Sequence, residues 1–293
     1  MNKDKVIVGL GEVLWDSLPE GMVLGGAPAN CAFHASQYGC CGVVASAVGR
    51  DALGDRVLSE LESKDVEHVI ARNDMPTGVV EVSLDKSGSP QYDIKENAAW
   101  DAIPYSGPMR QLAMRCDAVC FGTLAQRSVQ SRSTIYNFLD AMPATSLRVF
   151  DANLRQRFYS EPIITESLRR SNVLKINEAE IGVFCDMYGV GECDLNCSCL
   201  SLIDKFALDA VILTCGSEGS YVITKNESSY LPTPCVTVAD TVGAGDSFTA
   251  AFISAMLGGR SLRDAHHIAV EVSAYVCKQH GATPLWNDSL RSM

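Results

Sequence analysis

Short, almost continuously apolar runs alternate along this chain with segments of helical character. The apolar runs are Val6–Gly9, Val43–Val48, Ala118–Phe121, Arg148–Asp151, Val173–Ile176 and Ala210–Thr214. Segments that read as helices lie between them, at Leu53–Lys64, Ser131–Ala141 and Ile163–Arg170. Apolar strands separated by helices are typical of a parallel sheet that is covered on both faces. The alternation therefore predicts an α/β fold with a doubly wound, mainly parallel sheet flanked by helices.

Polar or glycine residues follow several of these strands. The stretches are Asp151-Ala-Asn153, Asn177-Glu178 and Thr214-Cys215-Gly216. In open α/β sheets, ligands bind outside the carboxyl ends of the strands. We therefore expect these strand ends to converge on one site.

Two segments, at about 14–25 and 77–103, do not fit the alternation. The second has a period of two at Val80, Val82 and Leu84 and a turn at Ser87–Pro90. We expect a small antiparallel sheet outside the main one, acting as a lid that excludes water from a small substrate. A decorative hairpin or a dimer contact is the alternative, and a second subunit could also cover the lid. We expect residues 1–293 to form a single domain with this inserted lid, and a homodimer through the lid.

Charge and hydropathy restrict the partners. The 293 residues carry 35 acidic and 24 basic side chains, a formal charge of −11, with no basic stripe, so we expect no nucleic-acid partner. A polyanionic ligand would then need local neutralisation. Glu12 and Asp16 interrupt the N-terminal apolar run too early for a signal peptide or a membrane span, so we expect a cytoplasmic protein without a membrane partner.

Twelve cysteines raise the question of disulfides or zinc. Several lie inside apolar runs, where a reduced thiol packs as a small hydrophobic group. The cluster Cys193, Cys197 and Cys199 is the one candidate metal site, and it has no nearby histidine. Reduced cysteines are the favoured interpretation.

The run Asp240-Thr-Val-Gly-Ala-Gly-Asp-Ser-Phe248 places a small-residue turn directly before the apolar helical segment Phe248–Leu257. A helix beginning there would aim the free amides of Ala244, Gly245 and Asp246 at one point, which favours a phosphate. The Asp246 carboxylate would then act as a base that takes a proton from a hydroxyl attacking that phosphate. The alternative is a simple tight turn in which Asp246 only complements the helix dipole.

A second glycine-rich element, Leu24-Gly25-Gly26-Ala-Pro-Ala-Asn30, precedes the helical stretch Cys31–Tyr38. Its glycines allow a ligand to approach the backbone, and Asn30 offers a donor and an acceptor for sugar hydroxyls. The alternative is a loop with Asn30 as a helix N-cap.

Taken together, the two glycine-rich elements make the chain resemble the PfkB or ribokinase-like family of carbohydrate kinases. Two further landmarks occur in order, Asn177-Glu-Ala-Glu180 for the N-x-x-E motif and Thr214-Cys-Gly-Ser-Glu-Gly219 for the T-x-G-x-x-G nucleotide loop. The resemblance covers nearly the whole chain and implies a parallel α/β domain with a β lid. No G-x-x-x-x-G-K-[ST] segment or protein-kinase motif is present, and Leu14 breaks a dinucleotide-binding fingerprint that begins at Gly9.

The resemblance implies transfer of the ATP γ-phosphoryl group to a sugar hydroxyl. Asp246 would be the base, with the amides of Gly243, Ala244 and Gly245 around the moving group. Glu180 would hold Mg²⁺, through water. The positions that match the nucleotide site are Asn177, Thr214, Gly216 and Gly219. A K⁺ ion near Asp240, Val242 and Gly281 is a further possibility.

The acceptor sugar is suggested by finer resemblances to bacterial fructokinases. Three segments resemble the corresponding segments of fructokinases: Gly11–Asp16, Glu96–Asp101 and Asp151-Ala-Asn-Leu-Arg155. This resemblance implies that Asp16, Asn97 and Arg155 contact the substrate, in addition to Gly25, Gly26 and Asn30. D-fructose, phosphorylated at its 6-hydroxyl, is the first choice. Alternatives are a 2-keto-3-deoxygluconate kinase, in which Arg155 would pair with the sugar-acid carboxylate, a ribose or adenosine kinase, and a non-catalytic sugar sensor.

Overall fold

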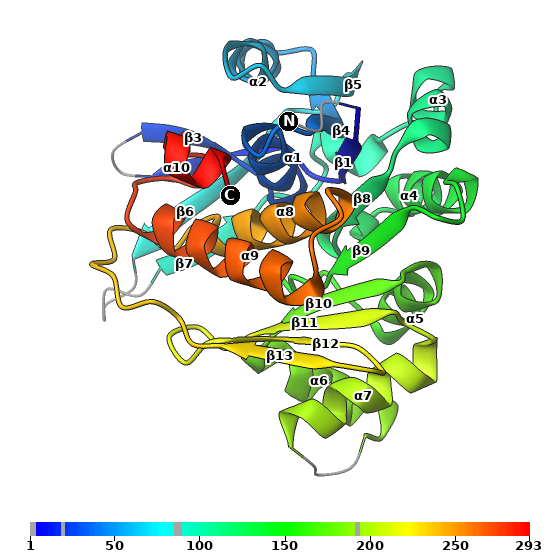
Figure 1. The fold of residues 1–293 in the computed structure, drawn as a ribbon. Helices are drawn as coiled ribbons and strands as arrows, with labels where there is room; N and C mark the ends of the chain where they lie inside the picture. Colours follow the sequence, from blue (N-terminus) through cyan, green and yellow to red (C-terminus); the bar gives the residue numbers. More distant parts are fainter. Residues whose placement is uncertain (1–3, 19–20, 85–89, 191–193) are drawn as a thin grey trace.

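A computed structural model describes residues 4–18, 21–84, 90–190 and 194–293. Its larger sheet has nine strands, in the order β13-β12-β11-β10-β9-β8-β1-β4-β5 (Figure 1). The strands from β5 to β11 in this order run parallel, and β12 and β13 run antiparallel at one edge. Their bounds are β1 Val6–Leu10, β4 Cys41–Gly49, β5 Glu67–Asn73, β8 Ala118–Phe121, β9 Leu147–Asp151, β10 Val173–Asn177, β11 Ala210–Thr214, β12 Ser220–Ile223 and β13 Ser228–Leu231.

Helices cover both faces of this sheet (Figure 1). One face carries α1 (Ala27–Gln37), α2 (Ala52–Ser63), α8 (Ala244–Leu257) and α9 (Leu262–Cys277), with α10 (Asp288–Arg291) against α9. The other carries α3 (Gly107–Arg115), α4 (Val129–Ala141), α5 (Glu161–Arg170), α6 (Glu178–Tyr188) and α7 (Leu195–Phe206). The predicted doubly wound α/β class is confirmed.

Alternate strand residues enter the two cores, as the pleat requires. On β9, Val149 packs into the core that contains Phe252 of α8, whereas its neighbour Phe150 packs into the core on the α4 side. On β10, Val173 and Leu174 divide in the same way. Both faces of the central strands are therefore buried, which explains why these runs are almost entirely apolar.

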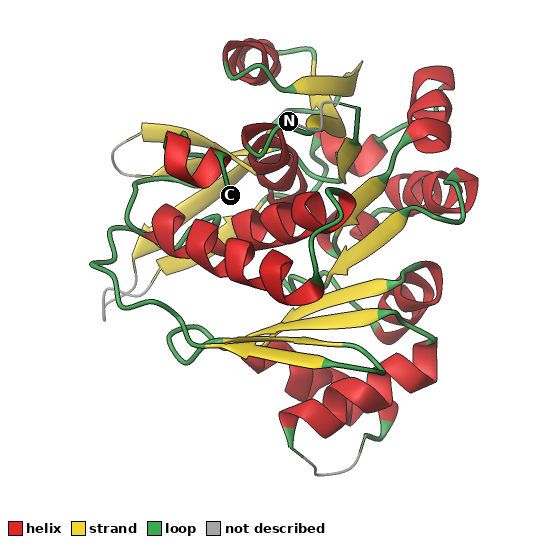
Figure 2. Cartoon of the chain, in the orientation of Figure 1, coloured by secondary structure: helices red, strands yellow, loops and turns green. Residues whose placement is uncertain are grey.

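All six predicted strands are present, whereas the sheet edges were not predicted. On one edge, β5 is only partly buried and reads Glu-His-Val-Ile-Ala-Arg-Asn. On the other, β12 and β13 form a short hairpin, and Ser228 and Tyr230 of its edge strand are exposed. An edge strand has less buried surface, so its sequence does not show the apolar run used for prediction. Figure 2 shows how the strands and helices alternate through the rest of the molecule.

The lid is a separate sheet with the strand order β3-β2-β6-β7. The strands are β2 Leu14–Leu18, β3 Gly21–Gly25, β6 Gly78–Leu84 and β7 Pro90–Ile94. The expectation of a purely antiparallel lid is wrong, because β2 and β6 pair in parallel. Each hairpin is antiparallel, but the two inner strands both leave the main sheet in the same direction, after β1 and β5. Residues 87–89 of the expected turn lie outside the described residues.

The last part of the segment 77–103 belongs to the main body. It forms the short helix η1 (Ala99–Ala102), where Trp100 and Asp101 are buried. Arg127, at the end of the short helix η2 (Leu124–Arg127), donates to Asp101 from Nε and Nη2, both at 2.8 Å. Arg127 also lies over the Trp100 ring, 4.0 Å from its centroid to Cζ. This buried pair anchors the base of the lid.

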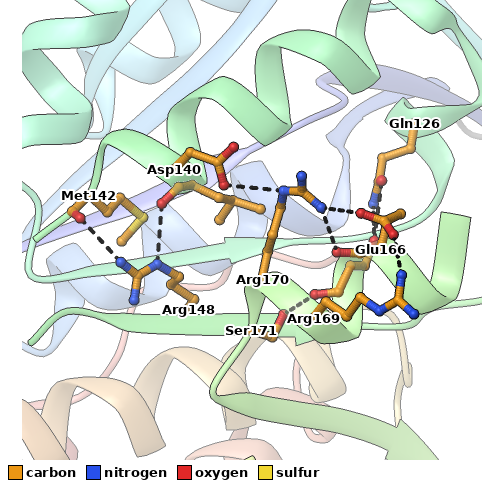
Figure 3. A network of polar contacts seen from close by, with 10 residues as sticks. Gln126, Asp140, Met142, Arg148, Glu166, Arg169, Arg170 and Ser171 are labelled. Atoms are coloured by element: carbon orange, nitrogen blue, oxygen red, sulfur yellow. Dashed lines mark hydrogen bonds and ion pairs between the residues drawn. The ribbon is translucent and has the colours of Figure 1, made fainter. Parts of the chain in front are cut away.

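A second polar network links η2 to α5 and α5 to α4 (Figure 3). Gln126 Nε2 donates to Ser167 Oγ of α5 at 2.9 Å. Further along α5, Arg170 contacts Asp140 of α4 at 3.2 Å and also pairs with Glu166. These contacts fix α4, α5 and η2 to one another.

No helix among the described residues has the length and apolar character to cross a membrane. Many of the cysteines are buried, among them Cys31, Cys40, Cys116, Cys120 and Cys215. Cys193 of the candidate metal cluster lies outside the described residues, and Cys199 is buried in α7.

Candidate active site

The structure brings the two glycine-rich elements together at the carboxyl edge of the main sheet. Asn30 Nδ2 of α1 donates to Asp246 Oδ2 of α8 at 2.8 Å, across 216 residues of sequence. Asp246 lies in the first turn of α8, which begins at Ala244 after Gly243. Two motifs distant in sequence therefore form one constellation, which a simple turn with a solvated acid would not require.

The turn before α8 requires glycine. Gly243 has φ 77°, and a Cβ atom there would lie 2.4 Å from the carbonyl oxygen of Ala282. Its left-handed conformation lets the chain reverse into α8 while residue 282 packs against the turn. The amides of the first helical turn are consequently directed to one point, as in other anion-binding helix termini.

The turn before α1 is equally constrained. Gly26 has φ 108°, and an added Cβ would lie 2.5 Å from the carbonyl oxygen of Glu12. Gly26 is the N-cap residue, α1 begins at Ala27, and the amide of Asn30 donates to the Gly26 carbonyl at 2.9 Å. The N-cap interpretation of Asn30 is therefore wrong: Asn30 lies inside the first turn, which leaves its side chain free to hold Asp246.

A cavity of about 620 Å³ opens beside the N-terminus of α8. Its lining includes Ala244 and Gly245 of the helix and all four positions that match a nucleotide site, Asn177, Thr214, Gly216 and Gly219. Asn177 and Thr214 are neighbours in register at the ends of β10 and β11. The cavity has the size and the small, largely uncharged lining of a nucleotide-binding pocket.

The Asn177–Glu180 motif is first of all a helix cap. Asn177 Oδ1 accepts from the Glu180 amide at 3.0 Å, and Glu180 Oε2 accepts from the Asn177 amide at 2.9 Å. Glu180 Oε1 also accepts from the Leu154 amide at 2.7 Å. Both carboxylate oxygens are thus engaged by backbone, although each keeps a lone pair. Glu180 fits a water-mediated contact with a magnesium ion and does not fit direct ligation.

Other residues expected to contact the sugar lie on the lid and on the loop after β9. A Cβ on Gly25 would lie 2.4 Å from Asp16 Oδ2, so the Asp16 carboxylate rests on the glycine turn. The exposed Glu96 forms an ion pair with Arg157, which places the Asn97 segment beside the loop that carries Arg155. Asn97 itself is exposed, with φ 60°.

Three carboxyl groups here have a raised pKa. Burial and the charge of Asp151 raise the pKa of Asp246 to about 6, opposed by Asn30, Lys175 and Arg155. Burial raises the pKa of Asp16 to about 6 and that of Glu12 to about 7, and Arg155 opposes both shifts. Such clustered shifts are typical of functional sites.

Asp240, the candidate K⁺ residue, ties two loops together. Its Oδ1 accepts from the Val242 amide and its Oδ2 from the Gly281 amide, both at 3.0 Å. The adjoining Ala282 carbonyl accepts from His34 Nε2 at 2.8 Å, and Trp286 Nε1 donates to His34 Nδ1 at 3.0 Å. Burial lowers the pKa of His34 to about 4, so this imidazole is neutral. Segment 281–286 therefore braces the Gly243 turn from behind.

Three residues at this candidate site, Glu12, Lys175 and Asp151, were given no role of their own from the sequence, although the strand end at Asp151 was expected to lie near it. Glu12, at the carboxyl end of β1, is 3 % exposed, and its Oε2 has no partner among the described residues. Lys175 and Asp151 form a buried ion pair at 3.1 Å beneath α8. A signal for Lys175 was present, because a lysine inside an otherwise apolar predicted strand must have a buried partner.

A helix N-terminus beside a cavity of this size, with a carboxylate in its first turn, is an arrangement that suits phosphoryl transfer. The sequence profile described as pfkB family carbohydrate kinase matches residues 20–288. The chain therefore belongs to the pfkB family of carbohydrate kinases, and the resemblance seen in the sequence is confirmed.

Relatives of the chain include sugar kinases of several kinds. A putative sugar kinase, PH1459, from Pyrococcus horikoshii is 28 % identical, with 98 % of this chain and 95 % of the relative aligned. A fructokinase from Salmonella typhimurium is 27 % identical over 84 % of this chain and 83 % of the relative. The crystal structure of a Vibrio cholerae fructokinase in a form with fructose, ADP and calcium bound has a TM-score of 0.83 and 22 % identity, over 99 % and 98 % of the two chains. At that identity the structural match shows the fold.

Proposed function

We propose that this carbohydrate kinase transfers the γ-phosphoryl group of ATP to the 6-hydroxyl of D-fructose. The observation that carries the proposal is the 2.8 Å contact between Asn30 and Asp246, at the junction of the glycine turns and the nucleotide-sized cavity. The two substrates would meet at this junction, the nucleotide from the Gly216 side and the sugar from the lid side.

Asp246 is the proposed general base. Asn30 occupies Oδ2, and Oδ1 would receive the proton of the acceptor hydroxyl. As that proton moves, the sugar oxygen forms a bond to the γ-phosphorus, and the bond to the β,γ-bridging oxygen breaks with its electron pair left on ADP. The amides of Gly243, Ala244 and Gly245 would donate hydrogen bonds to the equatorial oxygens of the phosphoryl group during its transfer.

Asn177, Thr214, Gly216 and Gly219 are the proposed nucleotide contacts, since all four line the cavity. A magnesium ion, held to Glu180 through water, would supply neutralisation of phosphate charge. The two carboxylate oxygens of Asp240 already accept hydrogen bonds from the amides of Val242 and Gly281. A K⁺ ion near Asp240 would therefore be held mainly by other oxygen atoms, and we make it a secondary proposal.

On the acceptor side, Asp16, Gly25, Gly26, Asn30, Asn97 and Arg155 are the proposed sugar contacts. The charges favour a neutral ketose over a sugar acid. In the part of the chain that the structure describes, Arg155 is the one cation that acts on all three of Glu12, Asp16 and Asp246, and the pKa of about 6 for the two aspartates leaves them mostly ionised at neutral pH. A carboxylate ligand such as 2-keto-3-deoxygluconate would compete with these acids for one arginine and be repelled by them.

We also propose one domain with a lid, and a homodimer through that lid. Leu14 and Val80 of the lid sheet share a buried core with Leu10 of the main sheet, which supports a single folding unit. On the lid, Leu18 and Val23 are 36 % and 37 % exposed, which suits coverage by a second subunit. The cytoplasmic location stays a prediction.

A coupled assay of ADP formation with fructose, 2-keto-3-deoxygluconate, ribose and adenosine tests the proposal. We expect fructose to give a kcat/KM at least about tenfold above the others, which corresponds to about 1.4 kcal/mol of discrimination. Preference for the sugar acid would transfer the assignment to that class. Sugar binding without phosphate transfer to any acceptor would identify a sensor.

A further inference from the structure

A buried lysine lies at the positive end of α8, where a cation is electrostatically out of place. Lys175 is 7 % exposed and points from β10 to the face of the sheet that α8 covers. A Cβ on Gly245 would lie 3.1 Å from Lys175 Nζ. A side chain at 245 would crowd the ammonium, which comes close to the first helical turn although the helix dipole repels a cation there.

Negative charge around Lys175 compensates for its burial. Asp151, its neighbour in register on β9, is 2 % exposed and bonds to Nζ at 3.1 Å. Glu180 and Asp246 also act on the ammonium, and together the three carboxylates raise the pKa of Lys175 although burial opposes them. The lysine is therefore charged, and one strong partner engages it.

This arrangement has no packing explanation. An apolar pair of the same size would fill the space between β9, β10 and α8 without the cost of burying two charges. The one event that brings further negative charge to this helix turn is the arrival of a phosphoryl group, which the proposed function places there.

We propose that Lys175 is a positioning residue of phosphoryl transfer: its ammonium balances the negative charge that gathers at the first turn of α8, and Asp151 holds it beneath Gly245. This inference rests on the proposed kinase function. Lys175 acts through the helix turn and through Asp246, and it needs no direct contact with the sugar.

The pair also acts on Asp246 in opposite directions. Asp151 raises the pKa of Asp246, whereas Lys175 lowers it. The other groups that act on Asp246 are Asn30 of α1, Arg155 of the loop after β9, Glu12 at the end of β1 and Cys120 of β8. None of these is altered by a substitution at 151 or 175, so opposite shifts from the two sites can be assigned to the pair.

The test compares Lys175→Met, Asp151→Asn and the double variant with the wild-type enzyme, over pH 5 to 9. We expect Lys175→Met to lower kcat about 100-fold, comparable to the loss of one oxyanion-hole donor, with the sugar KM changed less than about threefold. Its acid limb of kcat/KM moves to higher pH, because Asp246 loses a neighbouring cation. In Asp151→Asn the acid limb moves to lower pH, and in the double variant it lies above that of Asp151→Asn.

Acid limbs that coincide in all variants, or that move in the same direction for both single substitutions, would overturn the role of Lys175. If Lys175→Met does not fold, Asp151→Asn and the double variant still differ only at residue 175. An equal acid limb in those two proteins would then also overturn the inference. An inactive wild-type enzyme would overturn the proposed function itself, and with it this role.

Discussion

The two sides of the proposed active site differ in their chemistry. Among the described residues, the lining of the nucleotide-sized cavity contains no Asp, Glu, Lys or Arg, and it consists mostly of small or apolar side chains and glycine backbone. The acceptor side holds Glu12, Asp16 and Asp246, all with a raised pKa, together with Arg155. The phosphate donor brings its own charge, whereas the acceptor hydroxyl must be ionised by the protein. The ionisable groups therefore gather where a proton has to move.

The largest expected effect is that of replacing Asp246, the proposed general base. Asp246→Asn should lower kcat about 10³- to 10⁴-fold because it removes the proton acceptor, and sugar affinity by calorimetry should change less than about threefold. Asp264→Asn is the matched control, since Asp264 is a first-turn acid of α9. If both variants kept the wild-type rate, Asp246 would be only a dipole partner.

The next effect concerns the sugar contact. Asp16→Asn should raise the KM for fructose about 10- to 100-fold, the usual cost of a lost charged hydrogen bond, and leave the KM for ATP unchanged. Asp93→Asn, on an exposed position of lid strand β7, should change neither. An increase in the KM for ATP alone would contradict the prediction and indicate that Asp16 contacts the nucleotide and not the sugar.

On the proposed nucleotide side, we expect the KM for ATP to depend on the size of the side chains that line the cavity and not on their charge. Ala274, on α9, is 7 % exposed and lines the cavity. Ala274→Phe should raise the KM for ATP about tenfold, about 1.4 kcal/mol of lost binding, with the fructose KM unchanged in steady-state assays. His267→Phe adds the same ring on an exposed position of α9 and serves as control. Equal effects of the two would argue against a nucleotide in this cavity.

The last prediction concerns stability and not turnover. Burial raises the pKa of Glu12 from 4.5 to about 7, so its ionised form destabilises the fold. Stability from this group is present below pH 4.5 and is lost as pH rises through 7. Glu12→Gln should therefore raise the free energy of unfolding at pH 8 by about 3 kcal/mol, at about 1.4 kcal/mol per pKa unit. Urea unfolding at pH 8 measures the change, and the exposed Glu227→Gln should show none.

The central fold was predictable because buried parallel strands leave long apolar runs in the sequence. The run at Val173–Ile176 gave β10, even though Lys175 interrupts it. Its partner Asp151 could not be identified, because the pairing depends on the register of β9 and β10. In the lid, the alternation of apolar and polar residues indicated strands. The parallel pairing of β2 and β6 was not predictable, because it depends on the direction in which the chain leaves the main sheet before each hairpin.

The active site was predictable where a motif combines glycine with a reactive side chain. Asn30 and Asp246 were both identified, and the structure places them 2.8 Å apart. Glu180 was identified by its spacing from Asn177, but the same spacing is that of a capping box, and the structure shows that its oxygens serve the backbone. Glu12 was overlooked because a single acid after a strand has no pattern that distinguishes it from a surface residue.

The brace behind the Gly243 turn has a consequence for synthesis. Gly281 and Ala282 contact Asp240, Gly243 and His34, so the turn depends on chain that leaves the ribosome well after α8 does. A chain without residues 281 and 282 would lack the contacts that hold Asp240 and pack against Gly243. We therefore expect the turn that carries Asp246 to take its final form only once this late segment of the chain has folded against it.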